Sequence, residues 1–377
     1  MVRNRENSKK ENLLKAEGRD SVPHIVLLAS GGGQRAAVSL VGSLYQMAQD
    51  GLLDSLLYLG GVSGSTWSMA SLYSDPEWSW NMDRAQSRLS GDGVELQDAL
   101  GWLNKTAAED GFSLSDVWGV LTSAGIMKQM DERRLSDEAN RNASNPYPIY
   151  SAVEKHSKWF EVSPHEAGFT ELDLFVNTSL LGSKFQMGDL LEKKPEMDMI
   201  KLQGVCSSCI NLIRDSKAGI RSLAGTQQFK PVLLRLCFMH CLTFSIFILP
   251  LFWRADSTVP ACLLMEERFQ LVDAGALINV GYPPFLGDKR DIDLIIAPEY
   301  SAGDMFEVLD YAAKVKKPFP VIDDRILEDR DWPKDCYVFD GKENEPTIIY
   351  MPLFNRHNCK GLEHDTTLTF EHVYGVE

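Results

Sequence analysis

The sequence lacks the features of several protein classes. Its 377 residues contain seven cysteines, an odd number and too few for a disulfide scaffold in a chain of this length. Cys206 and Cys209 form a CxxC pair, but no second CxxC and no histidine pair completes a zinc site. The N-terminus is polar and mixed in charge, which predicts no signal peptide and a reduced, cytosolic setting. We expect no metal and no other cofactor.

Positive charge is also scarce, because 38 Lys and Arg stand against 53 Asp and Glu and the net charge is −15. An acidic chain has no overall attraction for nucleic-acid phosphates, so no nucleic-acid partner is expected, and no obligate protein partner is evident. The composition, 44% hydrophobic and 24% charged, excludes a disordered or fibrous protein. No Pro/Gly-rich linker divides the chain. We therefore expect one domain over 22–360, with a polar arm at 1–21 and a tail at 361–377.

Two strand–glycine–helix units begin this domain. The apolar run HIVLLA at 24–29 predicts a buried strand, which a glycine run and an amphipathic helix over 35–49 follow. The same order returns in a strand at 56–59, a glycine turn and a helix at 65–73. Such repetition favours an α/β sheet with parallel strands. Helices are also predicted at 114–127 and 305–316, strands at 171–177, 291–297 and 348–351, and a polar stretch with helical patches at 80–160.

Ser63 stands in the turn of the second unit, in the sequence Gly61-Val-Ser-Gly-Ser65. A nucleophile elbow needs this context, because a sharp strand-to-helix turn lifts a serine hydroxyl above the sheet and small neighbours permit the strained backbone. The usual pattern is GxSxG, and Ser65 replaces its last glycine. An ordinary Ser/Gly helix start is the alternative interpretation.

The glycine run Gly31–Gly33 has two interpretations. Its free N–H groups could bind phosphate, which would make the protein a nucleotide-binding enzyme, but the spacing of both common phosphate-binding motifs is missing. An oxyanion hole of an acyl hydrolase is the other interpretation, and the elbow serine favours it. Asp273 follows an apolar strand end, where catalytic groups gather in α/β sheets. None of the seven histidines has a recognisable catalytic context.

Three segments carry a family resemblance: SGGGQRA at 30–36, GVSGSTW at 61–67 and VDAGALINVGYPPF at 272–285. They resemble the catalytic domain of the cytosolic (group IV) phospholipase A2 family and, more distantly, patatin lipases. The likeness spans most of 22–358 and is greatest to the gamma-type members, which lack an N-terminal C2 module. It implies an α/β fold with a mixed, mostly parallel sheet flanked by helices.

The resemblance also implies the site. Ser63 would be the nucleophile and Asp273 its base, a dyad that needs no histidine. The backbone N–H groups of Gly32 and Gly33 would form the oxyanion hole, and Arg35 would bind the substrate phosphate, which suits its planar guanidinium group. A carboxylate is a weak base for a hydroxyl unless burial in a dry cleft raises its pKa.

The implied function is calcium-independent hydrolysis of glycerophospholipid acyl esters at a phospholipid membrane surface, and it is compatible with lysophospholipase activity. The sequence contains no EF-hand loop pattern, and we expect no C2-like domain to bind calcium. A catalytically impaired, lipid-binding relative is one alternative, and the nucleotide-binding enzyme is the other. The C-terminal VYGVE has no prenylation cysteine, which some gamma-type relatives carry.

Residues 205–262 depart from the family pattern. The interval between Ser63 and Asp273 is short, and a shortened, atypical lid region is expected there. Residues 231–253 are nearly all apolar, while 216–255 contain five basic residues and no acidic one. An interfacial segment docking on anionic lipid fits this composition. A buried helix, a membrane span at 232–253 or a mis-spliced insert are alternatives, but a single span would separate Ser63 from Asp273.

Overall fold

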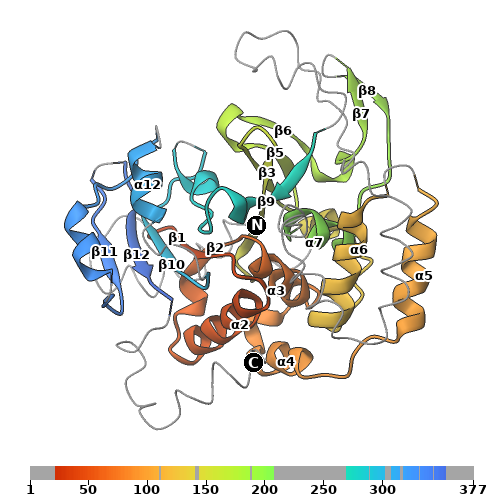
Figure 1. The fold of residues 1–377 in the computed structure, drawn as a ribbon, viewed down its shortest axis with the longest axis horizontal. Helices are drawn as coiled ribbons and strands as arrows, with labels where there is room; N and C mark the ends of the chain where they lie inside the picture. The colour runs from red at the N-terminus through yellow and green to blue at the C-terminus, as the bar shows by residue number, and fades with distance from the viewer. Residues whose placement is uncertain are drawn as a thin grey trace.

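The computed structural model (Figure 1) describes residues 22–109, 112–140, 144–186, 189–207, 269–287, 289–301, 307–314, 317–330, 332–342 and 344–353. The strands within them are β1 (Ile25–Ala29), β2 (Leu56–Gly61), β3 (Tyr147–Glu154), β4 (Lys158–Val162), β5 (Glu166–Phe169), β6 (Leu174–Asn177), β7 (Lys184–Gln186), β8 (Asp189–Glu192), β9 (Leu271–Asp273), β10 (Leu294–Pro298), β11 (Tyr337–Phe339) and β12 (Thr347–Met351). The α-helices within them are α2 (Gly33–Gln49), α3 (Gly64–Tyr73), α4 (Met82–Leu89), α5 (Leu96–Thr106), α6 (Leu114–Val120), α7 (Met199–Ser207) and α12 (Glu307–Lys314).

A ten-stranded sheet forms the centre of the described structure, in the order β11-β12-β10-β1-β2-β3-β4-β5-β6, with β9 paired to β3. The neighbouring strands β12, β10, β1, β2 and β3 are all parallel, and the strands beyond them pair antiparallel. The β7–β8 hairpin is separate. The predicted α/β architecture, a mixed sheet with a parallel centre flanked by helices, is confirmed.

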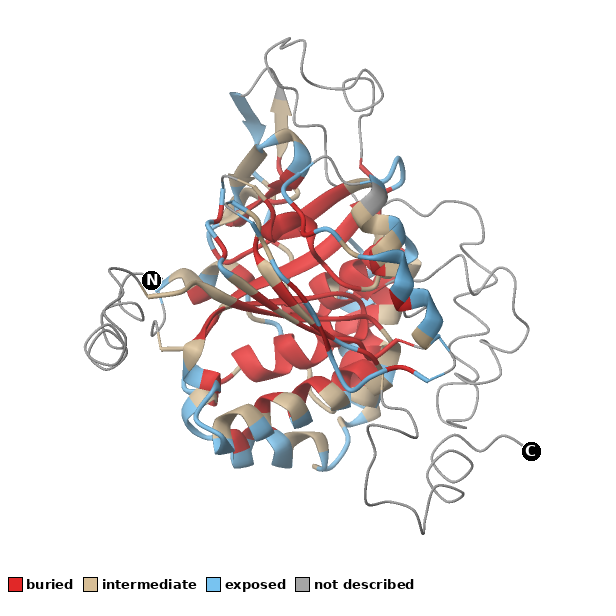
Figure 2. Ribbon diagram, turned by 90° about the vertical axis from the view of Figure 1, so that its left-hand side faces the viewer, coloured by how far each residue is buried: buried red, intermediate tan, exposed pale blue. Residues whose placement is uncertain are grey.

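The apolar run that predicted the first strand is buried on both faces of the sheet. Leu27 and Ala29 pack in one hydrophobic cluster with α2, α3, α4 and α7, whereas Val26 and Leu28 pack in a second cluster with α12. Successive side chains of a strand point to opposite faces, so each face receives alternate residues. Figure 2 shows the resulting buried centre of the molecule. Both strand–glycine–helix units form as predicted, as β1–α2 and β2–α3.

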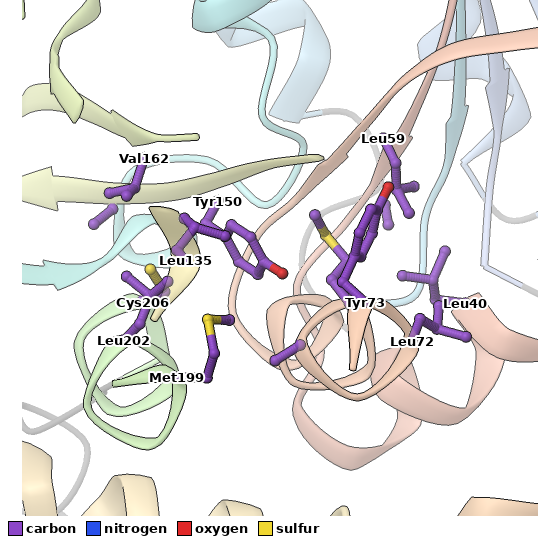
Figure 3. Packing of buried hydrophobic residues seen from close by; sticks show 14 of the residues in the cluster. Leu40, Leu59, Leu72, Tyr73, Leu135, Tyr150, Val162, Met199, Leu202 and Cys206 are labelled. Atoms are coloured by element: carbon purple, nitrogen blue, oxygen red, sulfur yellow. The ribbon is translucent and has the colours of Figure 1, made fainter. Parts of the chain in front are cut away.

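Tyr150 of β3 lies between two of the helices that cover the first face. Figure 3 shows it between the α7 residues Met199 and Cys206 on one side and Tyr73 of α3 on the other. All ten residues of α3 are buried. Because α3 follows the turn that contains Ser63, this packing fixes the direction in which the turn leaves the sheet.

Helices α6 and α7 cross at two glycines. A Cβ on Gly119 of α6 would lie 2.3 Å from the carbonyl oxygen of Ile200, and one on Gly204 of α7 would lie 2.1 Å from that of Ser115. A side chain at either position would therefore force the helices apart. The crossing holds α7 against β9, the strand that ends at Asp273.

The polar interpretation of residues 80–160 was wrong over its last part, because β3 and most of β4 lie there. Both strands are buried, yet they include Ser151, Glu154 and Glu161, which interrupt the apolar pattern. Glu161 is fully buried because it pairs with Arg290, with 2.5 Å between carboxylate oxygen and guanidinium nitrogen. A buried strand that contains such paired polar residues does not show a continuous apolar pattern, so a hydrophobicity pattern does not predict it.

Other predicted elements form with shifted ends. The helix predicted at 114–127 is α6 continued by a π-helical turn over Leu121–Ile126, and the strand predicted at 171–177 begins only at Leu174, after a 3₁₀ turn. The helix predicted at 305–316 corresponds to α12, and the late strand to β12. Residues 205–207 close the packed helix α7. The rest of the predicted atypical segment, the polar arm and the tail lie outside the described residues.

Candidate active site

Ser63 lies in a strained turn between β2 and α3. Its φ is 53°, a value that residues other than glycine rarely adopt, and its ψ is −124°. The next residue must be glycine, because a Cβ on Gly64 would lie 1.9 Å from the carbonyl oxygen of Gly33. Ser63 itself is 9% exposed. This is the geometry of a nucleophile elbow rather than of an ordinary helix start.

The glycine run lies against this turn. Gly32 and Gly33 have φ of 139° and 62°, and a Cβ on Gly32 would come within 2.6 Å of the Tyr300 carbonyl oxygen. A Cβ on Gly31 would lie 3.3 Å from Cβ of Ser63, so the two turns are in direct contact. Gly33 begins α2, where the first N–H groups have no acceptor within the helix. Such N–H groups can stabilise an oxyanion beside Ser63.

The sheet register brings Asp273 to the same place. Gly61, the last residue of β2, pairs with Tyr150 of β3, and Asp273, the last residue of β9, pairs with Ala152 two residues further along. The opposite edge of β3 pairs with β4 over the same residues, so β9 occupies the β2 edge just where β2 ends. Figure 1 shows β9 beside β3. Ser63 follows β2 by two residues, and the register therefore places it beside Asp273.

Asp273 is held from two directions. It is 1% exposed, and its Oδ1 accepts a hydrogen bond from the Gly275 N–H at 2.8 Å. Cys206 of α7 lies behind it: burial, with the charge of Asp273 as the second cause, raises the pKa of the Cys206 thiol. A thiol that stays neutral adds no second negative charge near Asp273.

Arg35 lies in the first turn of α2, partly exposed, beside the glycine run. Its Nε donates a hydrogen bond to the Tyr300 carbonyl oxygen at 2.6 Å, which fixes the side chain. No carboxylate in the described part of the chain forms an ion pair with it. The guanidinium group is therefore oriented by one N–H while the others remain for an anionic ligand.

The described histidines lie elsewhere. His24 precedes β1 and His165 contacts the Tyr147 hydroxyl at 2.8 Å, both at the opposite ends of the parallel strands from the glycine run and Ser63. His156 is exposed in the turn between β3 and β4. The other four histidines lie outside the described residues. Within the described ranges, no three His, Cys, Asp or Glu side chains gather as a metal site.

Sequence reasoning missed a group of residues behind the glycine run. Asn279 accepts a hydrogen bond from the Gly31 N–H at 3.0 Å, and Glu307 accepts one from the Asn279 N–H at 2.7 Å. Glu299 follows β10 and is buried, and burial raises its pKa. Glu299 could have been found from the sequence, because it directly follows the apolar run DIDLIIAP. Asp273 was found by the same signal, a carboxylate at the end of an apolar strand.

Comparison with known proteins decides the family. The family described as "Lysophospholipase catalytic domain" matches residues 25–213. The chain belongs to this family. Its resemblance to the cytosolic phospholipases A2 is confirmed by human cytosolic phospholipase A2 zeta, 31% identical over 93% of this chain and 52% of that protein. Human cytosolic phospholipase A2 gamma is 27% identical, over 91% of this chain and 81% of that protein.

The solved structures agree with this family assignment. Human GIVD cytosolic phospholipase A2 superposes with a TM-score of 0.75 at 26% identity, covering 94% of this chain and 54% of that one. The same protein in complex with methyl gamma-linolenyl fluorophosphonate gives a TM-score of 0.70 at 28% identity, over 94% and 53%. The predicted cytosolic phospholipase A2 catalytic fold is therefore confirmed.

The chain spans about half the length of the zeta-type relatives that it matches. The alignment to human zeta extends over 441 positions, more than the 377 residues of the whole chain. The relative therefore carries residues within the matched region that this chain lacks. Among the described residues, no helix combines the length and the apolar character that crossing a bilayer demands.

Proposed function

We propose that the protein hydrolyses acyl esters of glycerophospholipids, without calcium, through a dyad of Ser63 and Asp273. The observation that carries the proposal is the strand pairing: β9, which ends at the buried Asp273, and β2, which precedes Ser63, pair with the same edge of β3. Membership in the lysophospholipase catalytic domain family supports the reaction class. Lysophospholipase activity is compatible with the same site.

The reaction follows from these groups. Asp273 accepts the proton of the Ser63 hydroxyl while Oγ attacks the ester carbonyl carbon. The N–H groups of Gly32 and Gly33 stabilise the tetrahedral oxyanion, and the proton passes to the departing lysophospholipid oxygen. Water then attacks the acyl-serine while Asp273 takes its proton. The bond between the acyl carbon and Oγ breaks, the proton passes from Asp273 to Oγ, and the fatty acid is released. The close contact between the glycine run and the elbow supports this assignment.

Two alternatives make different predictions. The residues missing relative to human zeta favour a catalytically impaired relative that only binds lipid. The nucleotide-binding interpretation of Gly31–Gly33 has less support, because the spacing of both common phosphate-binding motifs is missing. A nucleotide-dependent rise in melting temperature would nevertheless favour it.

Hydrolysis of phosphatidylcholine vesicles tests the proposal. The full chain is expected to release fatty acid and lysophospholipid, and the rate in excess EDTA to stay within about twofold of the untreated rate, because the mechanism uses no metal. Vesicle binding without product release would favour the lipid-binding relative. Loss of binding or of turnover on chelation would contradict calcium independence.

Arg35 is expected to act on substrates that carry phosphate. Arg35→Ala should lower kcat/KM for phosphatidylcholine roughly 10- to 100-fold, the loss of a charge-assisted hydrogen bond, and should change hydrolysis of a neutral p-nitrophenyl ester much less. Arg35→Lys should recover only part, because lysine is a point charge without the planar fork. Equal losses on both substrates would mean that Arg35 only fastens α2 to the Tyr300 carbonyl.

A further inference from the structure

One buried carboxylate, Glu299, and one partly buried carboxylate, Glu307, lie behind the glycine run and have no part in the proposed reaction. Glu299 follows β10, is 3% exposed and accepts a hydrogen bond from the Ser301 N–H at 2.9 Å. Glu307 is the first residue of α12. It accepts two hydrogen bonds from Asn279, one from the main-chain N–H at 2.7 Å and one from Nδ2 at 3.2 Å. Buried carboxylates are costly unless such donors compensate them, so their place behind the glycine run calls for an explanation.

Asn279 connects both halves of the site. Its carbonyl oxygen accepts the hydrogen bond of the Gly31 N–H at 3.0 Å. Its Oδ1 lies 2.8 Å from the position that a Cβ on Gly31 would take, and 3.2 Å from that of a Cβ on Gly275. Asn279 thus packs between the glycine run and the Asp273–Gly275 turn, and its position sets their separation.

We propose that Glu307 is a positioning residue: by holding the main-chain and side-chain amides of Asn279, it fixes the spacing of the glycine run and the Asp273 turn around Ser63. The inference rests on the proposed function, since it assigns Glu307 a role in that reaction. Glu307 acts through Asn279 and touches neither Ser63 nor substrate. A misplacement of about 1 Å at such a site costs roughly 100-fold in rate.

The charges around Glu307 make this positioning dependent on pH. Burial, and next the charge of Glu299, raise the pKa of Glu307 to about 7. Arg35 lowers the pKa of Glu299. Burial raises the pKa of Tyr282, and Glu299, Glu307 and Tyr311 of α12 raise it further. Protonation of Glu307 weakens its acceptor strength toward Asn279. The site is therefore held firmly above about pH 7 and loosens below it.

A purely structural role for Glu307, as an anchor of α12, predicts a different result. An anchor would change the melting temperature. It would leave unchanged the fall in rate at low pH, which is the acid limb of the pH–rate profile. A positioning residue changes kcat with little change in KM, because the oxyanion hole matters in the transition state rather than in substrate binding.

The test is the rate at which an alkyl fluorophosphonate labels Ser63, measured on the full chain from about pH 5.5 to about pH 9, with kcat and KM for a neutral ester alongside. The wild type should show an acid limb near pH 7. Glu307→Gln, neutral at every pH, should remove the contribution of Glu307 to that limb, so that the rate falls only as Asp273 is protonated, and should lower the plateau rate and kcat roughly 10- to 100-fold at unchanged KM. Asp310→Asn, an exposed carboxylate on the same helix, is the matched control and should behave as wild type.

Glu299→Gln provides a second, independent readout that does not require Glu307→Gln to fold. Removing the like charge lowers the pKa of Glu307, so the acid limb should move to lower pH. A wild-type plateau and acid limb in Glu307→Gln, or an unmoved limb in Glu299→Gln, would overturn the inference. A wild-type chain that is not labelled at Ser63 at any pH would overturn the proposed function as well, and the two failures are thereby distinguished.

Discussion

Ser63→Ala should abolish acyl-ester hydrolysis, with kcat at least about 10⁴-fold lower on phospholipid and on a neutral ester alike. The substitution removes the only atom that forms the acyl intermediate, and any residual rate comes from binding and the oxyanion hole. Alanine keeps the Cβ and the backbone of the turn, so the fold should persist. Circular dichroism and the melting temperature check this while product release is measured.

Ser68→Ala is the matched control for this variant. Ser68 lies on α3, the helix that follows Ser63, and is fully buried, and its hydroxyl donates to the Ser65 carbonyl oxygen at 3.1 Å. Its loss should cost about 1 kcal/mol of stability and leave kcat unchanged. Retained turnover in Ser63→Ala would mean that another nucleophile carries the reaction.

Asp273→Asn should have the second-largest effect, a fall in kcat of about 10³- to 10⁴-fold. Asparagine is nearly isosteric and its Oδ1 can keep the hydrogen bond from the Gly275 N–H, so the turn after β9 is preserved while the proton acceptor is lost. Single-turnover kinetics should show that acylation itself is slowed. Asp291→Asn, at an exposed carboxylate, should leave turnover unchanged.

A histidine-dependent mechanism gives the opposite pattern. His357 and His364 lie outside the described residues, and a triad through either would keep Asp273→Asn near normal turnover. Turnover would then be lost in His357→Ala or His364→Ala. That outcome would replace the dyad by a triad.

The parts of the fold that follow local rules were predictable from the sequence. The apolar run at 24–29 and the two glycine turns predicted β1–α2 and β2–α3, because buried parallel strands read as unbroken apolar segments. The elbow could also be predicted, since its requirement for small residues acts within five positions of the chain. Strands β3 and β4 could not, because the partner of Glu161 is Arg290, far away in the sequence.

The sequence indicated candidate site residues but not how the fold would bring them together. A strand-end position marked Asp273, but nothing local indicated that β9 would pair with β3 at the end of β2. The same limit hid Glu307, whose contact with Asn279 joins residues 28 positions apart. Long-range pairing depends on the whole sheet register, and a residue pattern along one segment does not contain it.

The most direct test of the Ser63–Asp273 account is the location of the covalent adduct that an alkyl fluorophosphonate forms with the native chain. In this reaction Oγ displaces fluoride from phosphorus as it would attack an ester carbonyl. Peptide mass spectrometry should find one phosphonyl group, on Ser63, formed equally in excess EDTA and absent from Ser63→Ala and from denatured protein. An adduct on any other residue, or none on the folded wild type, would contradict the account.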